Sequence, residues 1–131
     1  MDEVTRRVAL ARQALATLAE ALDQPKSALA RDAGIQRFEY SFEATWKATQ
    51  RFLREAEGVE AASPAAAIRS AHAVGLVDEP RARLALDMLR DRNLTAHTYN
   101  EALAKEIFAR LPSYARLLGD WIQALEDRAR R

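Results

Sequence analysis

The chain has 131 residues, of which 49% are hydrophobic and 30% are charged. This composition excludes a disordered or membrane-embedded protein, and the length suits one domain with a buried core. The chain lacks cysteine, which excludes disulfide bridges and thiolate metal ligands. A net charge of +1 excludes nucleic-acid binding by bulk positive charge but is compatible with a local basic patch. Without a membrane span or a signal-peptide pattern, we expect a single cytoplasmic domain over residues 1–131.

The first half of the chain predicts two long helices. Residues 2–22 repeat apolar side chains at helical spacing, and Pro25 with Ser27 marks a break and a restart. The second stretch carries one apolar stripe and has Gly58 as its stop signal. The stripe consists of Ile35, Phe38, Phe42, Trp46, Thr49 and Leu53. We interpret its aromatic residues as core rather than as a platform for stacking bases.

Ser63 and Pro64 predict the start of a third, shorter helix. A serine N-cap followed by proline at the first helical position is a common helix start. This helix is expected to reach about Val74, with Gly75 as its cap.

Further start signals predict two more helices. Asp78 with Pro80 opens a fourth helix, and Asn100 opens a fifth, which Pro112 is expected to break or kink. No segment alternates with the period of a strand. The fold class is therefore all-α, an up-and-down antiparallel bundle of about five helices.

The stretch RDRNLTAHTYN, residues 90–100, carries the candidate functional residues. On a continued α-helix, Arg92 lies on the apolar arc and Tyr99, seven residues later, shares its face. Asn93 and His97 share an adjoining face. Arg92 and His97 differ by ~140° around an ideal helix, so both face one ligand only if the helix bends or a second subunit supplies the complement.

An arginine directed at a core needs an acceptor, because an unpaired buried guanidinium costs several kcal/mol. One interpretation is an internal ion pair between Arg92 and Glu39 or Glu43. The other is a cleft in which Arg92 binds a phosphate. Taken alone, His97 is a satisfied residue at a helix end, and Tyr99 packs its ring with the hydroxyl at the surface.

Other residues offer weaker sites. His72 is the only other histidine and has no partner at ligand spacing, so no metal site is expected. Glu39 and Glu43 precede Lys47 in steps of four residues. A solvated charge ladder explains this pattern more simply than a pair of catalytic carboxylates.

Three blocks in order resemble one family. IQRFEYSFEATWK, SPAAAIRSAHAVGLV and LDMLRDRNLTAHTYNE are similar to the nucleotidyltransferase substrate-binding proteins of the HEPN superfamily, from about residue 35 to residue 107. The resemblance implies a HEPN-like four-helix-bundle core and a homodimer. It also implies a metal-independent ribonuclease with an Arg-x4–6-His motif in the dimer cleft, and a minimal nucleotidyltransferase encoded beside it as its antitoxin.

The resemblance assigns roles to the motif. Arg92, Asn93 and His97 occupy the catalytic positions, with RNA as the substrate and no cofactor. Tyr99 occupies the position to which the nucleotidyltransferase attaches AMP to silence the nuclease. The chemistry is plausible without a metal, because the 2′-hydroxyl of RNA can attack the adjacent phosphate while His97 transfers protons and Arg92 stabilises charge.

Two functional hypotheses follow, together with a third that assigns no chemistry. The first is an RNA-cleaving toxin of a toxin–antitoxin system, restrained by AMP transfer to Tyr99. The second is a non-catalytic subunit that presents a substrate, or its own Tyr99, to the partner enzyme. The third is a dimeric helical scaffold.

Overall fold

The structure, a computed structural model, describes residues 2–130 and is all-α over that range. Five α-helices and one short 3-10 helix follow one another along the chain. They are α1 (Glu3–Leu22), α2 (Ala28–Glu57), α3 (Pro64–Ala73), α4 (Glu79–Leu94), η1 (Thr95–His97) and α5 (Glu101–Ala129). The predicted fold class is confirmed. None of the described helices is long and apolar enough to cross a membrane.

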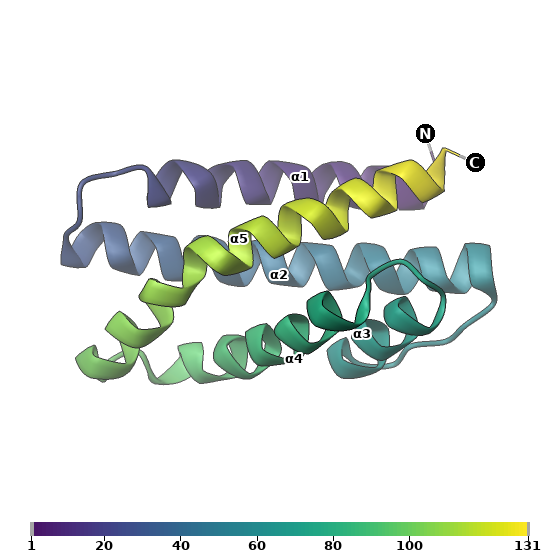
Figure 1. The fold of residues 1–131 in the computed structure, drawn as a ribbon. Coiled ribbons are helices and arrows are strands. Elements are labelled where there is room, and N and C mark those ends of the chain that lie inside the picture. Colours follow the sequence, from purple (N-terminus) through teal and green to yellow (C-terminus); the bar gives the residue numbers. More distant parts are fainter. Residues whose placement is uncertain (1, 131) are drawn as a thin grey trace.

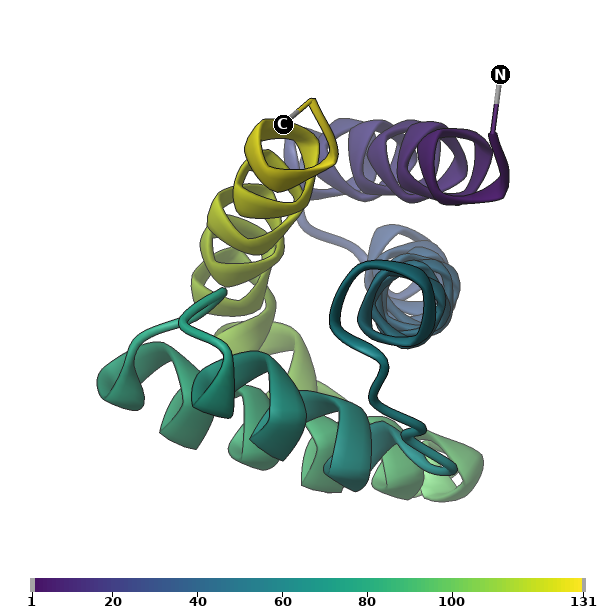
Figure 2. The same cartoon turned by 90° about the vertical axis from the view of Figure 1, so that its right-hand side faces the viewer.

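The long helices form an up-and-down bundle. In Figure 1, α2 lies between α1 above it and α3 and α4 below it, while α5 crosses diagonally over the front. Helices α1, α2 and α5 pack against one another, α3 packs against α2 and α4, and α4 also contacts α5 and α2. Figure 2 looks down the axis of α2 and shows the other helices arranged around it.

Each α-helix begins at a residue whose side chain accepts a hydrogen bond from the backbone N–H three positions later. These N-cap residues are Asp2, Ser27, Ser63, Asp78 and Asn100. Such caps satisfy donors that the first helical turn leaves unpaired. Gly58 ends α2 in the left-handed conformation, with φ of 66°, which glycine adopts without steric cost. These predicted boundaries are confirmed.

Pro112 lies inside α5, and the prediction that it breaks the helix is wrong. Helix α5 continues from Glu101 to Ala129 through the proline. Figure 2 shows that the first and last parts of this helix run in different directions, so the alternative prediction of a bend holds.

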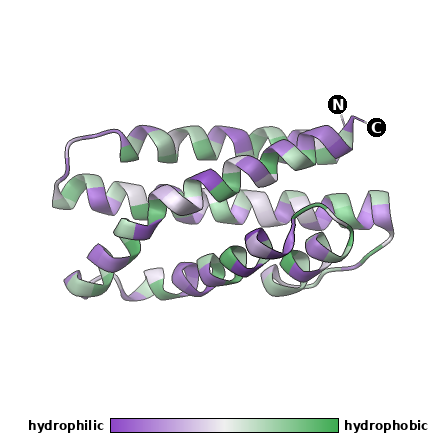
Figure 3. Ribbon diagram, viewed as in Figure 1, coloured by the Kyte–Doolittle hydropathy of each residue, from purple (hydrophilic) through white to green (hydrophobic). Residues whose placement is uncertain are grey.

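The apolar faces of the helices meet in one core. Figure 3 shows hydrophobic and hydrophilic residues alternating along the helices, the pattern of amphipathic helices with one buried face. Phe38 and Phe42 of α2 are fully buried, and Phe38 stacks on Tyr114 of α5 with 5.6 Å between ring centroids. The predicted core role of these two phenylalanines is confirmed. Trp46 is only partly buried and packs against the edge of the core.

Candidate functional site

The candidate residues lie where the chain passes from α4 to α5. Helix α4 ends at Leu94, and the 3-10 turn that follows carries His97 at its end. The hydroxyl of Thr95 donates to the carbonyl of Arg92 at 2.6 Å, within this tightened last turn. Tyr99 follows the turn and belongs to no helix. The prediction that Tyr99 shares the helical face of Arg92 is therefore wrong, because the α-helix does not continue that far.

Arg92 belongs to α4, and its half-buried side chain contacts α2. Its guanidinium lies over the ring of Phe42, 6.0 Å from the centroid, and its Nη2 donates to Glu43 Oε2 at 2.8 Å. The side chain remains 35% exposed. The hydrogen bond to Glu43 engages Nη2, and within residues 2–130 Nε and Nη1 make no hydrogen bond.

Glu43 is thus the hydrogen-bond acceptor that we expected for an arginine directed at the core. It also accepts a hydrogen bond from Trp46 Nε1 at 3.0 Å and forms an ion pair with Lys47 at 3.4 Å. Burial acts to raise the pKa of Glu43, but the hydrogen bond from Trp46 and the charges of Arg92 and Lys47 outweigh it, and the pKa is lowered. Of the two predicted ion-pair partners, Glu43 is the one that contacts Arg92.

His97, Tyr99 and Asn93 are all exposed. The hydroxyl of Tyr99 lies 3.4 Å from His97 Nδ1, and the two rings meet edge to face with 5.9 Å between centroids. Tyr99 is 85% exposed, although it is a large aromatic residue. No hydrogen bond joins Arg92 to His97 within the described chain. Within the described chain, Arg92 and the His97–Tyr99 pair are therefore not joined by a hydrogen bond.

A buried polar cluster immediately before the motif escaped sequence reasoning. Asp91 is only 2% exposed and receives hydrogen bonds from Arg110 at 2.6 and 2.9 Å and from the Tyr114 hydroxyl at 2.5 Å. Both partners belong to α5, so Asp91 fixes the end of α4 to that helix. The sequence carried one indication that Asp91 is buried, because this residue falls only ~20° outside the apolar arc of an ideal helix.

The cluster shifts the pKa values of its members. Burial acts to raise the pKa of Asp91, but the hydrogen bonds from Arg110 and Tyr114 outweigh it, so the pKa lies below the ordinary value. Burial and the neighbouring carboxylate raise the pKa of Tyr114. Asp91 is thus held as a carboxylate and Tyr114 as a neutral hydrogen-bond donor.

An open hollow of about 500 Å³ adjoins the motif on the side of α2. Its lining includes Thr98 together with Asp32 and Glu39 of α2. Two carboxylates make this hollow unfavourable for a phosphate. An anion near the motif is therefore better placed at Arg92 than in this hollow.

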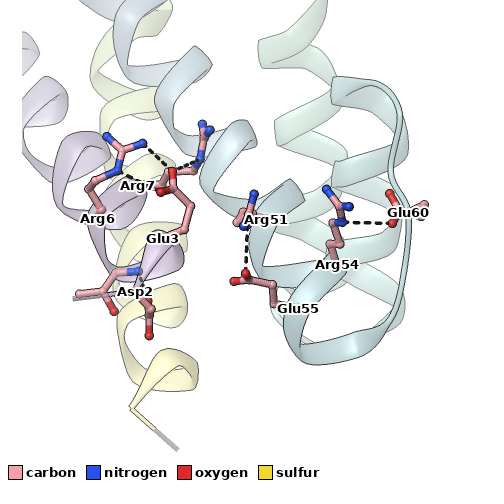
Figure 4. Close-up of polar contacts among 9 residues, drawn as sticks. Asp2, Glu3, Arg6, Arg7, Arg51, Arg54, Glu55 and Glu60 are labelled. Atoms are coloured by element: carbon pink, nitrogen blue, oxygen red, sulfur yellow. Dashed lines mark hydrogen bonds and ion pairs between the residues drawn. The ribbon is translucent and has the colours of Figure 1, made fainter.

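A group of arginines lies far from the motif, at the other end of the bundle. Figure 4 shows Arg6 and Arg7 on either side of Glu3, with Arg51 and Arg54 on α2. Each of these arginines is paired with a carboxylate of Glu3, Glu55 or Glu60. Pairing leaves little unbalanced positive charge, so this surface is a poor candidate for binding nucleic acid. Over residues 2–130, no group of three or more possible ligands is arranged to hold a metal ion.

The comparison with protein families identifies the chain. The family described as "Nucleotidyltransferase substrate binding protein like" matches residues 6–127, which is most of the sequence. The chain belongs to this family. The resemblance of the three sequence blocks is therefore confirmed. Among curated proteins, no relative was found.

Solved structures share the fold of this substrate-binding family member. A crystal structure of a protein from Thermus thermophilus is 57% identical and has a TM-score of 0.85, covering 88% of this chain and 98% of that one. A chain from a crystal structure of a toxin–antitoxin MntA-HpeT mutant has a TM-score of 0.80 and is 12% identical. It covers 95% of this chain and 97% of that one, and at this identity the likeness concerns the fold.

Proposed function

We propose that this protein is the HEPN-type toxin of a two-component toxin–antitoxin system, a metal-independent ribonuclease that a minimal nucleotidyltransferase silences by attaching AMP to Tyr99. The observation that carries the proposal is the exposed pair of His97 and Tyr99, 3.4 Å apart, in the turn that follows Arg92. Family membership supports a nucleotidyltransferase as partner. The fold shared with a toxin–antitoxin chain supports the same assignment.

The proposed cleavage uses the RNA's own nucleophile. The 2′-hydroxyl attacks the adjacent phosphorus, the bond to the 5′-oxygen breaks, and a 2′,3′-cyclic phosphate is formed. His97 removes the proton from the 2′-hydroxyl or supplies one to the leaving oxygen, since histidine exchanges protons near neutral pH. Arg92 stabilises the negative charge that develops on the phosphate through Nε and Nη1, while Asn93 orients the scissile group.

The proposal includes a homodimer, because no hydrogen bond joins Arg92 to His97 within the described residues of one chain. Across a twofold axis, Arg92 of one copy and His97 of the other can face the same phosphate. AMP on Tyr99 would bring a bulky anion next to His97, where it would occupy the phosphate site or repel RNA.

The test compares the purified protein with two histidine variants in an RNA-cleavage assay without the partner. We expect cleavage by the wild type and by His72→Ala, which removes the exposed histidine on α3, and a loss of about 100-fold or more in His97→Ala. Growth arrest on expression should follow the same order. Equal, negligible cleavage by all three proteins would overturn the ribonuclease assignment.

A second function, a non-catalytic subunit of a minimal nucleotidyltransferase, is favoured by one contact. Glu43 already neutralises part of the charge of Arg92, which suits a residue that holds the fold together or binds a ligand without cutting it. In this case the protein should form a stable complex with the nucleotidyltransferase in size-exclusion chromatography and show no cleavage. Failure to associate under any nucleotide condition would count against it.

A further inference from the structure

Tyr99 is held in an unusual place for an aromatic residue. It lies in the turn before α5, it is 85% exposed, and its ring packs edge to face on His97. Its hydroxyl does not extend into solvent alone but lies 3.4 Å from His97 Nδ1. The only imidazole near this exposed hydroxyl in the described chain is therefore in position to exchange a proton with it.

A neutral tyrosine is a poor nucleophile and needs a base. Phenols lose their proton only near pH 10 in water, so attack on a phosphorus atom near neutral pH requires a group that accepts the proton. A neutral histidine with Nδ1 unprotonated accepts a hydrogen bond from a hydroxyl, and it titrates in the range that suits general base catalysis. The arrangement of His97 and Tyr99 has the form of a base and its nucleophile.

We propose that His97 is the general base for the modification of Tyr99, an inference that rests on the proposed function. The oxygen of Tyr99 forms a bond to the α-phosphorus of ATP, and the bond from that phosphorus to pyrophosphate breaks. The hydroxyl proton passes to His97 Nδ1 and then to solvent, which is accessible because His97 is exposed. The products are tyrosyl-AMP and pyrophosphate.

One imidazole then serves both cleavage and its silencing. The new phosphodiester carries a negative charge beside His97, and a protonated imidazole pairs favourably with it. The tyrosine also loses the proton with which it could hydrogen-bond Nδ1. Modification thereby engages the histidine that RNA cleavage requires. A chain that has lost His97 would be both inactive and slow to be modified.

The experiment measures AMP transfer from α-labelled ATP by the partner nucleotidyltransferase to the full-length protein. Wild type, His97→Ala, His72→Ala and Tyr99→Phe are compared, with intact-mass and peptide mass spectrometry to locate the label. We expect His97→Ala to slow transfer by about 100-fold and His72→Ala to leave it unchanged. Added imidazole should restore part of the rate to His97→Ala, because the site is open to solvent. Tyr99→Phe should accept no label.

The outcomes separate this inference from the proposed function. If wild type is labelled on Tyr99 and His97→Ala is labelled at the same rate, His97 is not the base, but the proposed silencing of Tyr99 stands. If His97→Ala is slow and imidazole does not restore it, while its circular dichroism and complex formation match wild type, the base role is also overturned. If wild type takes no label on Tyr99, the base role and the proposed silencing by AMP transfer both fall, whereas the ribonuclease assignment is decided by the cleavage assay.

Discussion

At the scale of single residues, the proposed function makes Glu43 and an RNA phosphate competitors for Arg92. The carboxylate accepts from Nη2 at 2.8 Å, and about a third of each side chain is exposed. A pair with this exposure contributes little free energy, about 0.2–1 kcal/mol, because water screens it. A weak pair of this kind would let the guanidinium exchange Glu43 for the RNA phosphate that the proposed function requires.

The variant Glu43→Gln should bind RNA more tightly than its parent. Removing the competing charge should raise the affinity of Arg92 for phosphate by up to about five-fold, which is the upper end of the free energy of the weak ion pair. Fluorescence anisotropy with a labelled RNA in a His97→Ala background measures this without cleavage. Glu55→Gln, at the far end of α2 and away from the motif, is the matched control and should leave affinity unchanged. Weaker binding by Glu43→Gln would argue that the pair positions Arg92 rather than competing for it.

Asp91 should stabilise the folded state in a pH-dependent manner. Asp91→Asn removes the charge that Arg110 and Tyr114 contact, and we expect a loss of about 1–3 kcal/mol in the free energy of unfolding at pH 7. Because the folded pKa of Asp91 is lowered, this stability is present above the unfolded pKa. It is lost as the pH falls from about 5 through the folded value.

Urea unfolding of Asp91→Asn at several pH values tests this linkage. The difference between wild type and variant should shrink in acid. Asp87→Asn changes an exposed aspartate one turn earlier on α4 and should alter stability by less than about 0.5 kcal/mol. A difference that stays constant with pH would mean that the charge of Asp91 is not what stabilises the end of α4.

At the scale of elements, the motif is a short turn between two anchored helices. Asp91 fixes the end of α4 to α5, and Asn100 caps the start of α5 by accepting from the backbone N–H of Leu103 at 3.2 Å. His97 and Tyr99 lie between these two anchors. Their mutual position therefore depends on helix ends, not on a packed core around them.

Removal of the Asn100 cap should loosen this turn. Asn100→Ala leaves a backbone donor of α5 unpaired, at a cost of about 1 kcal/mol in stability, while Asn100→Asp keeps an acceptor and should cost little. Hydrogen exchange read by mass spectrometry should show faster exchange over residues 97–103 in the alanine variant only. Unchanged exchange there would show that other contacts order the turn.

At the scale of the whole molecule, the proposed active site needs two copies of the chain. Within one subunit, Arg92 pairs with Glu43 on α2 and His97 pairs with Tyr99. A twofold dimer places the same surface of each copy against the other, so each composite site takes one residue from each chain.

Mixed dimers distinguish a shared site from a site within one chain. Arg92→Ala and His97→Ala are each expected to be inactive in RNA cleavage. After the two are mixed and allowed to exchange subunits, each mixed dimer contains one intact composite site, and about a quarter of the wild-type activity should return. Native mass spectrometry, in which the mixed dimer has a mass between those of the two parent dimers, confirms that exchange has occurred. Mixed dimers without activity would assign both residues to a site within one chain, or to no site.

The local sequence determined where the helices start. Ser27, Ser63, Asp78 and Asn100 could be recognised as helix starts because each capping bond spans only three residues. Gly58 could be recognised as a stop because glycine itself favours the left-handed conformation that ends a helix. The three sequence blocks led to the family and to the four candidate residues. All of this information lies within a few residues along the chain or in the order of the blocks.

Only the tertiary structure decided how the candidate residues meet. The partner of Arg92 lies 49 residues away along the chain, and the two partners of Asp91 lie 19 and 23 residues away. No spacing rule selects Glu43 over Glu39. Helix α5 passes through Pro112 because packing against α1 and α2 compensates for the hydrogen bond that proline cannot make. Tyr99 does not lie on the face of Arg92, because α4 ends at Leu94 and the chain continues as a 3-10 helix from Thr95. In each case, contacts between residues far apart in the sequence determined which of several local conformations of similar free energy the chain adopts.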